Sequence, residues 1–176
     1  MVNVLILIAS AMLAPIYAVY VQDIGGSLLD AGVAMSMFAL AAGTMSLISG
    51  RLAGRVKRKY LLVGIGYILS GLGFIVHALV GSMWQLFAVQ VFIGLVQASY
   101  APVFDGLHGM FTGNVKQAGS RQSLWEASNY FSIAIGSIAG ATIVVYANFQ
   151  TMFFVMAAIC IISGFYLLAA GKKFRL

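Results

Sequence analysis

Long apolar runs alternate with short polar or glycine-rich breaks along the chain. A membrane-spanning helix needs about 20 mainly apolar residues, so runs of this length predict membrane spans. The last two runs are separated only by Asn148–Gln150, but together they are too long for one crossing, so we expect two spans there. The predicted spans are Val2–Val21, Ala31–Gly50, Tyr60–Val80, Gln85–Phe104, Leu124–Ala147 and Thr151–Ala170. The pattern predicts an all-α integral membrane protein, with residues 1–176 forming a single six-helix transmembrane domain.

Composition supports this fold class. Of the 176 residues 62% are hydrophobic and 8% are charged, whereas a soluble domain is about half apolar and about a quarter charged. Cys160 is the only cysteine, so no intramolecular disulfide and no cysteine metal cluster can form. We find no phosphate-binding glycine loop, no metal-ligand cluster and no nucleophile–base pair. The expectation is a protein that is not an enzyme and needs no cofactor or metal.

The basic residues predict the orientation of the spans. All ten lie in the breaks after the second and fourth spans or in the tail, namely at Arg51, Arg55, Lys57, Arg58, Lys59, Lys116, Arg121, Lys172, Lys173 and Arg175. Basic loops mark the cytoplasmic side of a membrane protein, so both termini are expected inside. The net charge of +6 therefore indicates topology and contact with lipid rather than nucleic-acid binding. We expect a multi-pass protein of the plasma or inner membrane.

The two halves of the chain resemble each other. Three pairs of segments match in the same order, at offsets of 87, 93 and 93 residues: Ala14–Tyr17 with Ala101–Phe104, Phe38–Gly43 with Phe131–Gly136, and Ile68–Gly71 with Ile161–Gly164. Each copy has three spans, so the second would cross the membrane in the opposite direction. That is the inverted repeat typical of secondary transporters. We predict repeats over 1–83 and 84–176; the alternative is a likeness of apolar composition alone.

The segment Gly50–Leu62 resembles the signature loop of the major facilitator superfamily, which joins the second and third helices. The residues that match are Gly50, Leu52, Ala53, Arg55, Arg58, Lys59 and Leu62. Gly54 stands where the family has an aspartate, and Lys57 where it has a glycine. We expect Gly50 to permit close helix approach. The alternative is that any cytoplasmic loop collects basic residues.

The resemblance covers one six-helix half of a family whose typical member has twelve helices. It implies a half-size transporter that moves an unidentified small solute by alternating access. A twelve-helix transporter would then be rebuilt from two copies as a homodimer or from one copy and a related half. The missing aspartate favours an alternative, a non-transporting scaffold or accessory subunit, and a passive facilitator is a third. In the fifth span, Gly136 and Gly140 form a GxxxG that is expected to pack closely on another helix.

Polar side chains within the spans are candidates for the pathway, because polar groups in a bilayer usually face a cavity or another helix. Gln90 and Gln97 share one face of the fourth span, since they are seven residues apart. The candidate pathway residues are Tyr17, Gln90, Gln97, Tyr100 and Asn129. For Gln90 and Asn129 a role as interhelical hydrogen-bonding groups is an equal alternative.

The remaining charged residues lie near the predicted cytoplasmic edge. We expect an ion-pair network formed by Arg51, Arg55, Asp105, Arg121 and Glu126. The alternative for Asp105 or Glu126 is a proton-carrying role. His77, near the outer end of the third span, is expected to lie at the membrane interface.

Overall fold

The computed structural model describes the backbone of residues 2–56, 58–111 and 115–174. It describes their side chains apart from residues 2, 3, 105–111, 115–118, 120, 121 and 172–174. The elements are α1 (Val2–Ala11), the short 3₁₀ helix η1 (Ala14–Ile16), α2 (Tyr17–Asp23), α3 (Leu28–Ala53), α4 (Lys59–Ala78), α5 (Met83–Phe111), α6 (Val115–Tyr146) and α7 (Phe149–Phe174).

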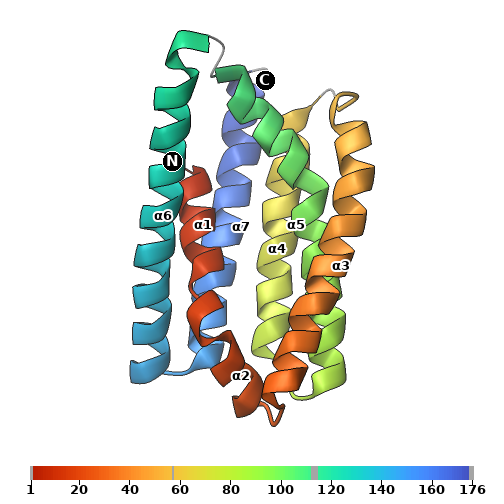
Figure 1. Cartoon of the computed structure of the whole chain (residues 1–176), viewed down its shortest axis with the longest axis vertical. Coiled ribbons are helices and arrows are strands. Elements are labelled where there is room, and N and C mark those ends of the chain that lie inside the picture. Colours follow the sequence, from red (N-terminus) through yellow and green to blue (C-terminus); the bar gives the residue numbers. More distant parts are fainter. Residues whose placement is uncertain (1, 57, 112–114, 175–176) are drawn as a thin grey trace.

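Within the described residues, six stretches are long and apolar enough to cross a membrane: Val4–Asp23, Leu28–Ala53, Lys59–Ala78, Met83–Phe104, Gln122–Tyr146 and Phe149–Gly171. The all-α fold with six predicted spans is confirmed. The helices form one bundle in which α3 ends, α4 begins, α5 ends and α7 ends at the same end (Figure 1). We call this the basic end, because it carries the loop between α3 and α4; which side of the membrane it meets remains a prediction.

The first span is not one helix. Pro15 lies in η1, which separates α1 from α2. At the opposite end of the bundle, the turn after α2 leads into a capping box in which Ser27 and Asp30 bond each other's backbone N–H groups. This cap begins α3 three residues earlier than the apolar pattern predicts, because Asp30 belongs to the first turn of the helix.

Helices α4 and α7 pack together along the centre of the bundle, with small residues at their contact. A Cβ atom at Gly71 would lie 2.6 Å from Ile161 Cγ1 and 3.0 Å from Ala157 O. A Cβ atom at Gly164 would lie 2.6 Å from Ile68 Cγ1 and 2.8 Å from Gly64 O. Small residues let two backbones approach closely where apolar burial provides no driving force.

The outer helices are held in the same way. On α6, Gly136 lies against the backbone of α1 and Gly140 against the turn that follows it, where a Cβ would collide with the carbonyl oxygens of Ile8 and Met12 respectively. On α5, a Cβ at Gly94 would lie 2.5 Å from the carbonyl oxygen of Phe38 in α3. Helices α3 and α6 therefore form opposite edges of the bundle, with α1, α7, α4 and α5 between them (Figure 1).

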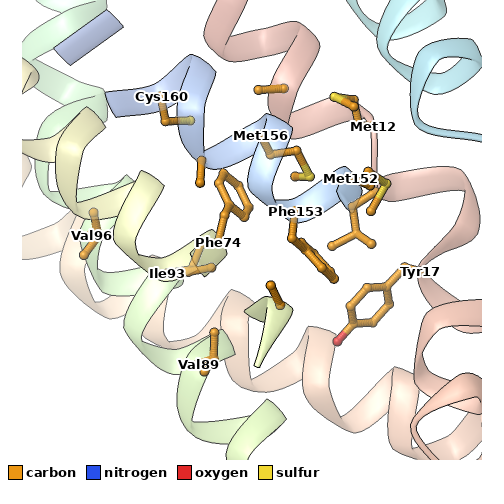
Figure 2. Packing of buried hydrophobic residues seen from close by; sticks show 14 of the residues in the cluster. Met12, Tyr17, Phe74, Val89, Ile93, Val96, Met152, Phe153, Met156 and Cys160 are labelled. Atoms are coloured by element: carbon orange, nitrogen blue, oxygen red, sulfur yellow. The ribbon is translucent and has the colours of Figure 1, made fainter. Parts of the chain in front are cut away.

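The buried side chains form one cluster between the inner helices. Its labelled members include Met12 from the turn after α1, Phe74 from α4, Ile93 from α5, and Met152 and Phe153 from α7 (Figure 2). By contrast, α3 and α6 turn many large apolar side chains outward, among them Leu40, which is 72% exposed, and Ile135, which is 57% exposed. A single copy of the bundle thus leaves both of its edge helices uncovered.

Candidate solute pathway

A cavity of about 260 Å³ lies among the first, second, third, fourth and sixth spans. Its walls are formed by Ser10, Leu13, Ala14, Tyr17, Met35, Phe38, Phe74, His77, Gln90, Ile93, Gln97 and Met156. We call it the central cavity. Three of the predicted pathway residues, Tyr17, Gln90 and Gln97, line it. The break in the first span positions the cavity wall, because Leu13 and Ala14 precede Pro15 and Tyr17 begins α2.

One hydrogen bond crosses from the first span to the fourth. Gln90 Nε2 donates to Tyr17 Oη at 2.5 Å, and both side chains are buried. Gln97 lies two turns further along α5 on the same face and is half-buried. None of the residues that line the central cavity carries a fixed charge. The cavity can therefore hold a mainly apolar solute and offer it a few hydrogen-bonding groups.

His77, which was expected at the membrane interface near the outer end of the third span, is buried against neighbouring helices. Its side chain has 2% of its surface exposed and lines the central cavity. Neither ring nitrogen has a hydrogen-bond partner in the described part of the chain. The sequence holds a signal for this burial. Steps of three and four residues place Tyr67, Ser70, Phe74 and His77 on one helical face, and all four side chains are buried.

A second cavity, of about 190 Å³, lies at the end of the bundle opposite the basic end. We call it the outer cavity. Its lining includes Tyr20 and Asp23 from α2, His77 from α4, Asn148 and Phe153. His77 is thus a wall residue of both cavities.

Two other predicted pathway residues lie elsewhere. Tyr100 is absent from the lining of the central cavity and packs edge-on against Tyr67, with ring centroids 5.2 Å apart. Asn129 lies on α6, and its buried Oδ1 has no hydrogen-bond partner among the described residues. Tyr100 packs inside because Gly66 on α4 leaves room for its ring.

The signature loop lies at the basic end, where Ala53 ends α3 and Lys59 begins α4. Gly50, Leu52, Arg55 and Arg58 are exposed, whereas Ala53 and Lys59 are half-buried. A Cβ at Gly50 would meet no atom within 4 Å, so the close approach expected there does not occur within the described part of one copy.

The predicted ion-pair network falls partly outside the described residues, because the side chains of Asp105 and Arg121 are not described. Of the other three members, Arg51, Arg55 and Glu126 are exposed. Glu126 accepts a hydrogen bond from Gln122 one turn earlier on α6, at 3.1 Å. The network therefore remains a prediction.

Comparisons with known proteins agree on one family. The family profile described as Major Facilitator Superfamily matches residues 1–174. The uncharacterized MFS-type transporter YitZ of Bacillus subtilis is 27% identical over 171 residues, which cover 93% of this chain and 98% of YitZ. The multidrug resistance protein MdtG of Proteus mirabilis is 27% identical over 162 residues, which cover 89% of this chain and 40% of MdtG. The MdtG of Salmonella heidelberg is 23% identical over 178 residues, covering 99% of this chain and 44% of MdtG. The chain thus spans less than half the length of these MdtG proteins and nearly the whole of YitZ.

Proposed function

The chain belongs to the major facilitator superfamily, and from this premise we propose that it forms one six-helix half of a transporter for a small organic solute. The observation that carries the proposal is the central cavity, in which Tyr17, Gln90 and Gln97 supply hydrogen-bonding groups within an apolar wall. A concave, mainly apolar cavity with a few converging polar groups is the usual form of a small-molecule site. Six spans and membership of this family make the chain a multi-pass membrane protein.

The solute is mainly apolar and carries hydrogen-bonding groups. The lining residues include Phe38, Phe74 and Met156, and none has a fixed charge. The names of the MdtG relatives, multidrug resistance proteins, fit a solute of this class. Transport takes place across the plasma or inner membrane, with the basic end in the cytoplasm.

The solute moves by alternating access, in which the site opens first to one side of the membrane and then to the other. An inverted repeat provides two equivalent halves of the bundle that can open in this way. The support comes from the contact between α4 and α7. The 93-residue offset pairs Gly71 with Gly164, and it also pairs the residues that each glycine touches: Ile161 with Ile68, and Ala157 with Gly64. The same contact is thus made twice, once in each direction, as expected of the proposed repeats 1–83 and 84–176.

The working unit is a homodimer that encloses the pathway between its two copies. Helices α3 and α6 carry the exposed apolar side chains that a second six-helix half would cover, and they lie on opposite edges. A two-fold axis along the membrane normal would place α3 of one copy beside α6 of the other. The length of YitZ, nearly all of which this chain covers, supports a transporter built from halves.

Flux into liposomes tests transport. Vesicles containing the purified chain should take up 7-amino-4-methylcoumarin, a neutral and mainly apolar fluorescent probe with an amine and a carbonyl group, faster than protein-free vesicles. Gln97→Leu should lower this flux, because it removes a polar group from the cavity. Ser99→Ala is the matched control on α5, since its hydroxyl bonds the carbonyl of Val96 in its own helix. Downhill flux without accumulation would favour a facilitator, and no flux across a panel of uncharged and charged solutes would favour a scaffold.

Cross-linking in the membrane tests the dimer. In a Cys160→Ala background, Leu40→Cys on α3 and Ile135→Cys on α6 should form a disulfide between two copies under oxidation. Ile162→Cys on α7, which is 68% exposed, is the control, because α7 lies outside the proposed interface. A strictly monomeric chain would contradict the proposed homodimer.

A further inference from the structure

His77 is a buried polar group that the proposed solute site does not use. Both of its ring nitrogens are buried without a hydrogen-bond partner in the described part of the chain. The carbonyl of Gly73, one turn earlier, approaches the ring without completing a hydrogen bond. Leaving a buried polar group unpaired lowers the stability of the fold. A group retained at that cost in a membrane span is a candidate for function.

The surroundings hold the ring in place by its faces rather than by its nitrogens. The ring of Phe153 stacks on the imidazole, with centroids 5.0 Å apart and planes inclined by 24°. Tyr20 fixes the backbone at the same point, because its hydroxyl donates to the carbonyl oxygen of His77 at 3.0 Å. The position of the imidazole is therefore set by α2 and α7, while neither ring nitrogen is held by a hydrogen bond in the described part of the chain.

The ring lies at the boundary between the two cavities. The central cavity is on one side, with Tyr17 and Gln90, and the outer cavity is on the other, with Tyr20 and Asp23. The titratable residues that face these cavities, besides His77, are Tyr17, Tyr20 and Asp23, all on α2. The lining residues from α5, α7 and the loop between α6 and α7 are amides, a thioether and apolar side chains.

We propose that His77 is a proton-binding site that exchanges its proton with the outer cavity in one conformation and with the central cavity in another. A neutral imidazole carries one N–H and one free nitrogen. The free nitrogen takes a proton from hydronium in one cavity and forms an imidazolium. The cation then gives a proton to water in the other cavity and returns to the neutral ring, so one proton moves and no other bond changes.

The conformation described here is the closed one, because both nitrogens are buried although the ring borders both cavities. Tyr20 covers the ring on the outer side, with ring centroids 6.0 Å apart. Phe74 covers it on the inner side, at 6.4 Å. Coupling of this proton to solute movement rests on the proposed function, whereas the proton site itself does not.

Nuclear magnetic resonance of the full chain in lipid nanodiscs tests the site without any solute. The chain has two histidines, so His108→Gln with ¹⁵N-labelled histidine leaves signals from His77 alone. We expect these signals to move reversibly from the neutral ring to the imidazolium as the pH falls. A ring that keeps one neutral tautomer at every pH at which the helical circular dichroism persists would overturn the proposal.

Flux tests the coupling. Accumulation of 7-amino-4-methylcoumarin driven by a pH gradient should be lost in His77→Gln, which keeps a donor and an acceptor but takes up no proton, and retained in His108→Gln. Equal gradient response in the wild-type chain and in His77→Gln would overturn the coupling. If the wild-type chain moves no solute, the proposed function fails, and the pH titration of the ring still decides on the proton site.

Discussion

The first and fourth spans contain the same short pattern but fold differently. In the first span Ala14–Ile16 form η1 and Tyr17 begins α2, whereas α5 continues without a break through Ala101–Phe104. A proline within a helix removes the hydrogen bond to the carbonyl four residues earlier. In the fourth span that carbonyl belongs to Ala98, and the Ser49 hydroxyl of α3 donates to it at 2.6 Å.

The first span receives no such help from the equivalent position. The 93-residue offset pairs Ser49 with Thr142 on α6, and Thr142 donates instead to Ile138 in its own helix, at 2.7 Å. Hydroxyls from neighbouring helices are one way in which membrane helices accommodate proline. The proline alone therefore does not decide whether a span stays continuous. A side chain of a neighbouring helix, such as Ser49, also contributes.

The largest effect is expected where the broken span is held. Gly140→Val would drive a side chain into the backbone of Met12, and overpacking of this kind costs about 1–3 kcal/mol or more. With α1 displaced from α6, the melting temperature in detergent should fall steeply and the chain should aggregate. Gly43→Val on α3 is the control, because a Cβ there meets no atom within 4 Å. Equal loss in both variants would show that α1 does not depend on this contact.

The next effect is on the continuous span. Ser49→Ala leaves the Ala98 carbonyl without its donor, and we expect a loss of about 1–3 kcal/mol in unfolding free energy. Pro102→Ala should restore most of this loss, because residue 102 would regain the N–H that bonds Ala98. Thr142→Ala is the control and should change stability by less than about 0.5 kcal/mol, since its hydroxyl is exposed. A Ser49→Ala loss unchanged by Pro102→Ala would contradict this explanation.

A smaller effect is expected from the bond that joins the two spans. Tyr17→Phe and Gln90→Leu each remove the hydrogen bond between α2 and α5. Interhelical hydrogen bonds in membranes contribute about 1 kcal/mol or less, and we expect a coupling energy of that size from a double-mutant cycle. Additive effects of the two substitutions would mean that the bond adds nothing to the stability of the bundle.

The smallest effect is expected away from both spans, at Gly54. Its φ is −67° and a Cβ there meets no atom within 4 Å, so Gly54→Asp should change stability by less than about 0.5 kcal/mol. The variant restores the aspartate of the family pattern and provides the baseline for the other three. A loss of more than about 1 kcal/mol, measured by thermal unfolding, would indicate a contact at this loop that one copy does not contain.

The sequence was sufficient to predict six spans and the shared face of Gln90 and Gln97 on the fourth span, whereas a solute pathway along Tyr17, Gln90 and Gln97 stays a prediction. Those predictions rest on run length and helical spacing, which are local properties of the chain. The start of α3 was predicted too late, because a capping box overrides apolar patterning at Asp30. The depth of a side chain was harder to predict: Tyr100 and His77 each lie where packing against another helix places them, and spacing along one helix does not specify that partner.

The doubled contact between α4 and α7 has an energetic consequence. If the two repeats are equivalent, opening the bundle at one end deforms the contact of Gly71 with Ile161, and opening it at the other end deforms the matching contact of Gly164 with Ile68. The conformations open at either end then differ little in free energy. A solute shifts the equilibrium between two conformations only by the difference in its affinity for them. When the two conformations are almost equal in free energy, a small difference in affinity is enough. Ser49 breaks this equality, because it stiffens the fourth span and has no counterpart acting on the first. The resting bundle should therefore be biased toward one side of the membrane before any solute binds.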